Sequence, residues 1–240
     1  MYVFFRVSRI MDGLFFLWPM IVPFILPILY TILYKRSNLK IVGILIVITL
    51  CIILFFYPLI SVLSSIPYSY ELVKVLLFLI FPICVLKIFT HEPFLDLLPQ
   101  VGVQKKNSRL SITLALFFLP IMTITSLVVW VLLQPAFSAS IVTGFLSFFE
   151  SFTEEFFFRG ILFLYLYKQT NLPIAYVTST LSFILMHPQH FFTWFLLITI
   201  VQAILTIEVA RRSENILGSW LIHGTNRLLW LTIFPLISIL

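Results

Sequence analysis

Apolar runs of about 20 residues, the length that a helix needs to cross a membrane's hydrocarbon core, recur along this chain from Leu14 to its last residue. Hydrophobic residues make up 61% of the 240 positions and charged residues only 10%, a balance far outside that of soluble domains. The sequence therefore predicts an all-α, polytopic transmembrane helix bundle, and it argues against a soluble enzyme.

About eight membrane segments are predicted, at residues 14–34, 39–60, 71–90, 110–133, 141–167, 172–187, 191–209 and 215–236. The first segment contains Pro19, Pro23 and Pro27 at four-residue spacing, which predicts a bent span. Basic residues precede it as in a signal peptide, but no small-residue cleavage site follows, so we expect a retained span.

The only sizeable polar stretch, residues 90–109, divides the chain into two parts. Residues 1–109 are predicted to form N-terminal membrane helices with a polar connection. Residues 110–240 hold nearly all of the polar side chains that fall inside membrane segments, so we expect this second bundle to carry the chemistry.

The basic residues orient the bundle, because cytoplasmic connections tend to be rich in lysine and arginine. Arg6 and Arg9 disagree with the other connections, and a re-entrant or interfacial first segment would remove the conflict. The pattern otherwise predicts cytoplasmic odd-numbered connections, both termini outside, and no patch suited to nucleic acid. The residues in the odd-numbered connections are Lys35, Arg36, Lys40, Lys87, Lys105, Lys106, Arg109, Lys168, Arg211 and Arg212.

The segment 141–167 carries several charges in the stretch "SFFESFTEEFFFRG". Glu155 and Arg159 are four residues apart, a spacing that predicts an ion pair on one helix face. Glu154 points away from Arg159 and is expected to have no cation of its own. Such a buried carboxylate has a raised proton affinity or binds water or metal, which suits a general base. Glu150 either shares its cavity or lies toward the outer part of the helix.

Histidines of two other segments can reach the same level. His187 ends a helix that Pro188 interrupts, and His223 lies in the last segment with Asn226 and Arg227 on one flank. At a rise of about 1.5 Å per residue, both histidines and Glu154 arrive on the cytoplasmic side of the membrane midplane. We therefore expect these three side chains to converge in a protein-lined cavity, where ionisable groups are tolerated.

The motifs EExxxR in "EEFFFRG", FxxxH in "FILMH" and the histidine of "GSWLIHGTN" together resemble the CPBP/Abi family of intramembrane proteases, which includes CAAX prenyl endopeptidases and lysostaphin-resistance-protein A-like proteins. The resemblance covers residues 139–232. It implies that Glu154, His187 and His223 line the catalytic cavity. The reaction that the resemblance implies is either metal-dependent or glutamate-dependent.

One departure from the family pattern concerns the position four residues after His223. The pattern commonly has asparagine there, whereas this chain has Arg227, with Asn226 one residue earlier. Asn226 can still lie near His223, as an oxyanion or water ligand. The resemblance leaves open whether Arg227 at this position permits proteolysis.

The leading hypothesis is an intramembrane endopeptidase in which Glu154, helped by His187, activates a water, and His223 and Asn226 stabilise the oxyanion. Zinc is a candidate cofactor, held by Glu154, His187 and His223, although no HExxH motif is present and no organic cofactor is expected. The expected partners are the lipid bilayer of a bacterial cell membrane and a peptide or membrane-protein substrate.

Two other hypotheses belong to different classes. The resemblance allows a non-proteolytic membrane protein on the same fold, such as a bacteriocin self-immunity factor or a scaffold. Buried Glu and His would also suit a small proton-coupled transporter, but the sequence shows no internal repeat of the kind that many transporters have.

Overall fold

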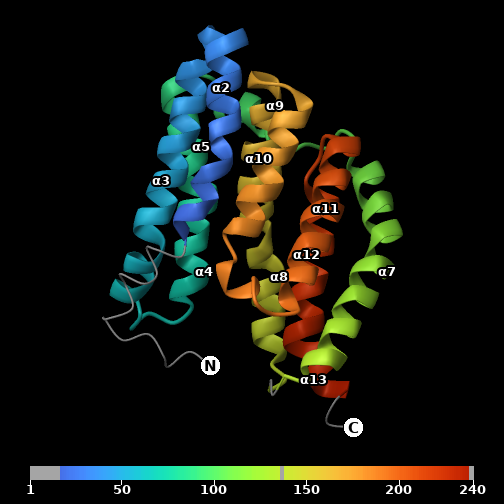
Figure 1. Ribbon diagram of the computed structural model, residues 1–240. Helices are drawn as coiled ribbons and strands as arrows, with labels where there is room; N and C mark the ends of the chain where they lie inside the picture. Colours follow the sequence, from blue (N-terminus) through green and yellow to red (C-terminus); the bar gives the residue numbers. More distant parts are fainter. Residues whose placement is uncertain (1–16, 136–137, 238–240) are drawn as a thin grey trace.

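The protein's computed structural model describes residues 17–135 and 138–237, and the regular structure in this part of the chain is helical (Figure 1). The predicted all-helical fold is confirmed. In chain order the elements are η2 Trp18–Phe24, α2 Ile25–Tyr34, η3 Arg36–Asn38, α3 Leu39–Val62, α4 Ser69–Lys74, η4 Val75–Ile80, α5 Phe81–Thr90, α6 Phe94–Gln100, α7 Ser108–Leu133, α8 Ile141–Glu155, η5 Phe156–Tyr165, α9 Leu166–Gln169, α10 Leu172–Leu185, η6 Pro188–His190, α11 Phe195–Ser213, α12 Leu217–Leu228, η7 Leu229–Ile233 and α13 Phe234–Ile237.

Three described helical stretches are long and apolar enough to cross a membrane by length and composition, namely Arg36–Val62, Ser69–Thr90 and Ser108–Leu133. Trp18–Tyr34 and Leu172–Leu185 are shorter apolar helices. Outward-facing apolar side chains are extensively exposed along the long helices, and such large apolar surfaces need a nonpolar surround. The chain is therefore an integral membrane protein, while the count of eight segments stays a prediction.

In the first segment, where the prolines predict a bend, the chain forms a 3₁₀ helix, η2, that contains Pro19 and Pro23 and runs into α2. Pro27 has no N–H, so the carbonyl of Pro23 loses its helical partner. Thr178 of α10 donates its hydroxyl hydrogen to that carbonyl at 3.4 Å. Neighbouring side chains thus satisfy the freed backbone. The predictions for Arg6, Arg9 and the start of this segment at Leu14 lie outside the described residues.

The connections that carry the basic residues lie together at one end of the bundle, the upper end in Figure 1. Lys35 Nζ in the first connection donates to the Thr170 carbonyl in the fifth at 2.9 Å. Gln104 Nε2 in the third connection donates to the Glu214 carbonyl in the seventh, also at 2.9 Å. We call this the basic end. That it faces the cytoplasm stays a prediction.

The described residues form two apolar core clusters, and the larger one, which runs from Leu17 to Ile216, links the two predicted parts of the chain. The phenylalanines that follow the glutamates, Phe156, Phe157 and Phe158, are almost fully buried in it. Helix α4 packs against α8, and η2 packs against α10. Helices of the first part of the chain therefore pack against the second part. The division into two parts at residue 109 stays a prediction.

The predicted segment 141–167 is one continuous helical stretch, but it is not α-helical throughout. After Glu155 the hydrogen bonding changes to the wider π form over η5, Phe156–Tyr165. Inside this stretch, Gly160 lies against the backbone of Val101, and a Cβ there would come within 2.7 Å of the Val101 carbonyl oxygen. Bulges of this kind often accompany functional sites, and this one directly follows the glutamates.

Candidate active site

Helix α8 carries three carboxylates into the bundle interior. Ser140 caps its first turn by accepting a hydrogen bond from the Thr143 N–H at 3.2 Å, which fixes where the helix begins. Glu150, Glu154 and Glu155 follow, and each is at most 5% exposed. Buried carboxylates at this density require cations or hydrogen-bond donors around them.

A cation for Glu154 comes from the first part of the chain, which corrects the prediction that this carboxylate has none. Lys74, at the end of α4, is completely buried and forms ion pairs with Oε1 of Glu154 and Oε1 of Glu150. The prediction considered only partners on the same helix, whereas Lys74 reaches across from a helix packed on α8. Glu150 thus belongs to the same buried cluster.

The predicted ion pair between Glu155 and Arg159 is present, with Arg159 Nε 3.4 Å from Glu155 Oε2. Arg159 also donates from Nε to the Thr206 hydroxyl at 2.8 Å and lies over the Phe183 ring at 4.4 Å. The other oxygen of Glu155, Oε1, lies 2.8 Å from Nδ1 of His223. The pair therefore has a further function, because it orients a histidine of the predicted site.

The structure brings Glu154, His187 and His223 together. Oε2 of Glu154 lies 4.0 Å from Nε2 of His187 and 3.9 Å from Nε2 of His223. This oxygen is buried, and it has no hydrogen-bond partner among the described residues. The predicted convergence is confirmed as geometry, while the catalytic roles of these residues stay predictions.

The hydrogen bonds of the two histidines determine which ring nitrogen faces Glu154. His187 Nδ1 lies 2.9 Å from the Phe183 carbonyl, and because a carbonyl only accepts, Nδ1 carries the hydrogen. His223 Nδ1 likewise donates to the carboxylate of Glu155. In their neutral forms both rings therefore present the lone pair of Nε2 toward Glu154. Three acceptors converge on one small space.

The ends of the helices place these rings. Helix α10 ends at Leu185, and Pro188 cannot continue it, so His187 lies in the break between α10 and η6. Helix α12, which carries His223, approaches α7 closely at Gly218. Only glycine fits there, because a Cβ at this position would overlap the Ser111 backbone. This close approach fixes the start of the helix that carries His223.

Asn226 and Arg227 both reach the site, although toward different partners. Asn226 Nδ2 donates to Gln202 Oε1 at 2.8 Å, and its Oδ1 accepts from the Ser126 hydroxyl at 2.5 Å. Arg227 Nη2 lies 3.4 Å from Glu150 Oε2. The departure from the family pattern therefore has a structural partner, since Glu150 balances the charge of Arg227.

Sequence reasoning assigned no role to three other residues of the site. These are Lys74, His190, which stacks on His187 with ring centroids 5.1 Å apart, and Gln202, which holds Asn226. The signal for Lys74 was a lysine inside the apolar stretch "ELVKVLLFLI", since a charge at such a position needs a buried partner. His190 lies three residues after His187, but its stacking depends on the helix break.

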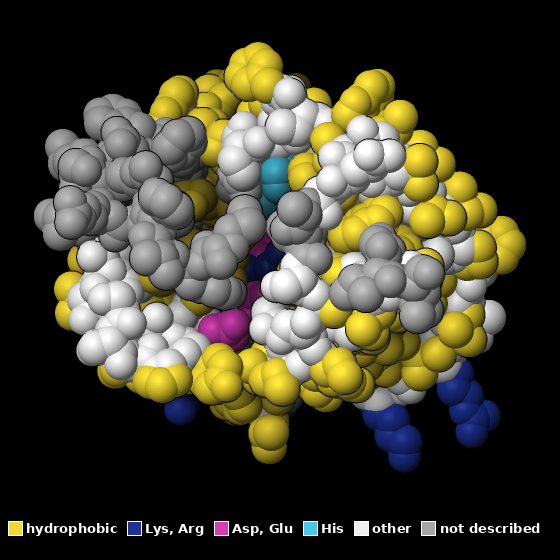
Figure 2. Space-filling view, turned by 90° about the horizontal axis from the view of Figure 1, so that it is seen from below, with side chains coloured by type: hydrophobic (Ala, Val, Ile, Leu, Met, Phe, Trp, Pro, Cys, Tyr) yellow, Lys and Arg dark blue, Asp and Glu magenta, His cyan; other side chains and the backbone are white. Residues whose placement is uncertain are grey.

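A cavity of about 210 Å³ adjoins these residues, and its polar lining includes His187, His190, Gln202, His223, Asn226 and Arg227. Figure 2 shows the molecule from the end opposite the basic end. In this view acidic, basic and histidine side chains are visible inside a hollow that is surrounded by other side chains. Charged and histidine side chains thus line a hollow that is open at that end.

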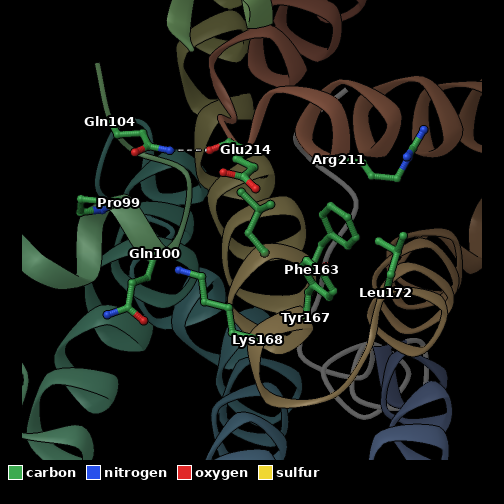
Figure 3. A pocket seen from close by; sticks show the side chains of 10 residues that line it. Pro99, Gln100, Gln104, Phe163, Tyr167, Lys168, Leu172, Arg211 and Glu214 are labelled. Carbon is green, nitrogen blue, oxygen red and sulfur yellow. Dashed lines mark hydrogen bonds between the residues drawn. The ribbon is translucent and has the colours of Figure 1, made fainter. Parts of the chain in front are cut away.

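A second cavity, of about 310 Å³, lies at the basic end (Figure 3). Its lining includes Gln104, Lys168, Arg211 and Glu214, and none of the predicted site residues. Arg211 is paired with Glu208 at 2.8 Å, and the Gln104 side chain donates to the Glu214 carbonyl. No carboxylate and histidine converge among the described residues here, so the smaller cavity is the candidate active site.

Three groups of this site are candidate ligands for a metal ion. Glu154, His187 and His223 supply three lone pairs, and both histidines are held through their other nitrogen, as metal ligands usually are. However, no group of three His, Cys, Asp or Glu side chains among the described residues is arranged to hold a metal ion. Lys74 also takes one oxygen of Glu154. This arrangement does not fit a three-ligand zinc site, and zinc stays a prediction.

The comparisons with known proteins bear on the second part of the chain. Residues 136–229 match the model of a protein family described as type II CAAX prenyl endopeptidase Rce1-like. The matched range almost coincides with the predicted range 139–232 and contains the three motifs. No curated protein and no solved structure matches the chain.

Proposed function

We propose that the chain is an intramembrane endopeptidase with Glu154 as general base. The premise is that residues 136–229 match the Rce1-like type II CAAX prenyl endopeptidase family, because membership of this family implies a membrane protease. One observation carries the proposal. Oε2 of Glu154 is a buried carboxylate oxygen without a hydrogen-bond partner among the described residues, and it faces the lone pairs of two imidazoles.

A water molecule suits the space between these three acceptors, because it has two hydrogens to donate. Gaps of 3.9 and 4.0 Å are too long for direct hydrogen bonds, and contacts of this length are commonly bridged by water. Glu154 and one histidine would hold such a water by its hydrogens. Its oxygen lone pair would then point into the cavity, toward a bound peptide.

The reaction follows from this placement. Glu154 Oε2 removes a proton from the water while the water oxygen bonds to the carbonyl carbon of the substrate, and the electrons of the C=O double bond move to oxygen. When this tetrahedral intermediate collapses, the C–N bond breaks and the proton on Glu154 passes to the leaving nitrogen. His187 steadies the water, and Asn226 offers its remaining amide hydrogen to the oxyanion.

His223 has a more restricted role than an oxyanion donor. With Nδ1 donating to Glu155, the neutral ring offers only a lone pair to the reaction. Donation from Nε2 requires the imidazolium form, because only that form carries a hydrogen on both ring nitrogens. We assign His223 to the binding of water in its neutral form and to the oxyanion only when it is protonated.

The proposed substrate is a peptide or a membrane protein, cleaved inside the membrane. Glu154 lies near the middle of the continuous helix 141–169, which supports a site within the bilayer, and the predicted depth is on the cytoplasmic side of its midplane. The hollow in Figure 2 is open at the end opposite the basic end, which supports entry of substrate from that side. A bacterial cell membrane is the proposed location.

Lys74 favours a second candidate function. A carboxylate held by a buried ammonium group is a weaker base, and that would suit a binding or bacteriocin self-immunity protein on the same fold. One variant, Glu154→Gln, distinguishes the two functions. Glu154→Gln would abolish protection of cells from a bacteriocin if cleavage is required, and it would leave protection intact if binding suffices.

The direct test of the proposed function is peptide cleavage by the purified protein in lipid vesicles. The wild type is expected to cleave members of a fluorogenic peptide library, and His187→Ala is expected to lower kcat by about 10²-fold, because the water loses one of the groups that hold it. His91→Asn is the matched control, since His91 lies at the basic end and its left-handed backbone tolerates asparagine. Equal kcat for wild type and His187→Ala would refute the assignment.

A metal assay tests the zinc prediction on the same preparation. Because Lys74 neutralises Glu154 through Oε1 and no three ligands among the described residues are arranged for a metal, we expect far less than stoichiometric zinc in the purified protein. We also expect 1,10-phenanthroline to leave peptide cleavage unchanged. Stoichiometric zinc that is lost in both His187→Ala and His223→Ala would instead establish the metal-dependent route. Elemental analysis of the three proteins makes the measurement independent of activity.

A further inference from the structure

The proposed reaction creates negative charge at a carbonyl oxygen, so the cavity must supply hydrogen-bond donors. While both histidines are neutral, the three groups that converge at the bottom of the cavity cannot supply them. Glu154 Oε2 is a carboxylate oxygen, and the neutral rings of His187 and His223 both present lone pairs. The donor must therefore come from another side chain that lines the cavity.

Asn226 is largely committed elsewhere. One hydrogen of its Nδ2 goes to Gln202 at 2.8 Å, and its oxygen accepts from Ser126 at 2.5 Å. These two bonds fix the amide against α7 and α11 and leave a single neutral N–H for substrate. A single neutral donor stabilises an oxyanion less than a charged one does.

Arg227 has donors to spare. It is the one Lys or Arg among the described residues that line the cavity, and its side chain is 34% exposed there. A guanidinium has five N–H donors. Nη2 donates to Glu150 Oε2 across a long 3.4 Å contact, and the guanidinium also forms a hydrogen bond with the Tyr70 side chain. Its Nε–H has no partner among the described residues.

The charge balance keeps Arg227 only loosely held. Glu150 is shared with Lys74, which lies closer to it than Arg227 does, so the carboxylate is already largely neutralised. Arg227 lines the same cavity as His187 and His223. Its guanidinium can therefore face a peptide bound in this cavity.

We propose that Arg227 is a catalytic residue that donates from its guanidinium to the carbonyl oxygen of the scissile peptide bond as negative charge develops there. This inference rests on the proposed function. As the water oxygen bonds to carbon, the C=O electrons move to oxygen and the guanidinium stabilises that charge. When the C–N bond breaks, the electrons return and the hydrogen bonds weaken. Arg227 itself gains and loses no proton.

The test compares Arg227→Gln and Arg227→Lys with the wild type in the vesicle assay. Removal of one oxyanion donor typically lowers kcat by about 10²–10³-fold, so we expect a loss of that size in Arg227→Gln with KM changed little. Arg227→Lys is expected to recover part of kcat, because it restores the charge without the planar fork. Arg212→Gln, at the exposed basic end, is the matched control and should behave as the wild type.

A double variant and an amidated peptide distinguish this role of Arg227 from two alternatives. If Arg227 merely balances the charge of Glu150, the double variant Arg227→Gln/Glu150→Gln regains wild-type kcat, whereas a catalytic Arg227 leaves it low. If Arg227 instead binds a carboxylate of the substrate, the defect appears in KM and disappears with a C-terminally amidated peptide. Either result would overturn the inference.

Failure of this inference can be distinguished from failure of the proposed function. If the wild type cleaves peptide and His187→Ala does not, but Arg227→Gln retains full kcat, only the role of Arg227 is wrong. If the wild type cleaves none of the peptides, the proposed function itself fails. Thermal unfolding of each variant in detergent separates loss of catalysis from loss of fold.

Discussion

Replacement of Glu154 by glutamine is expected to lower kcat for peptide cleavage by about 10²–10⁴-fold, the usual contribution of a general base. Glutamine keeps the size of the side chain and can still accept a hydrogen bond, but it cannot take a proton from water. Because binding of peptide does not require that proton transfer, KM should change little. Initial rates over a range of peptide concentrations, measured in lipid vesicles, give both constants.

A matched control is Glu208→Gln, which makes the same chemical change at the far end of α11. Glu208 pairs with Arg211 and Arg212 near the basic end, and exposed pairs of this kind contribute little to stability. This variant should retain the activity of the wild type. If Glu154→Gln kept more than a small fraction of wild-type kcat, another group would have to activate the water, and the proposed mechanism would be wrong.

The part of this site that sequence reasoning could predict is the part that helix periodicity and depth determine. Glu155 and Arg159 are four residues apart and do pair, even though the helix widens to the π form just after Glu155. The depth of His187 at the end of α10 and of His223 in α12 follows from counting residues along each helix. Both therefore met Glu154 as expected.

The rest depends on how the helices are rotated and packed, which periodicity on one helix does not give. Lys74 lies 80 positions before Glu154, and only the packing of α4 on α8 brings the two together. The contact of His223 with Glu155, the carboxylate next to Glu154, likewise needs the relative rotation of two helices. A stricter rule would have helped, since every charge predicted inside a membrane needs a predicted partner. Applied to this chain, it marks Lys74, Glu150, Glu154 and Arg227 as charges that need partners, but it does not say how they pair.

Replacement of Lys74 by methionine is expected to lower the free energy of unfolding by about 3–5 kcal/mol, the usual result when one partner of a buried ion pair is removed. Methionine has a similar length and fills the same space, so the loss comes from charge rather than from a cavity. Glu150 and Glu154 would remain buried without the ammonium group that now bridges them. Reversible denaturant titration in mixed micelles measures the change.

Two further variants show whether charge is the cause. Lys40→Met makes the same substitution at an exposed position of the basic end and should leave the free energy of unfolding unchanged. The triple variant Lys74→Met/Glu150→Gln/Glu154→Gln removes the stranded carboxylates together with the lysine, so it should recover most of the lost stability. If the triple variant were no more stable than Lys74→Met alone, the packing of the lysine stem, rather than its charge, would hold α4 against α8. In that case Lys74 would no longer explain how Glu154 remains ionised inside the bundle, and the general base would need another cation.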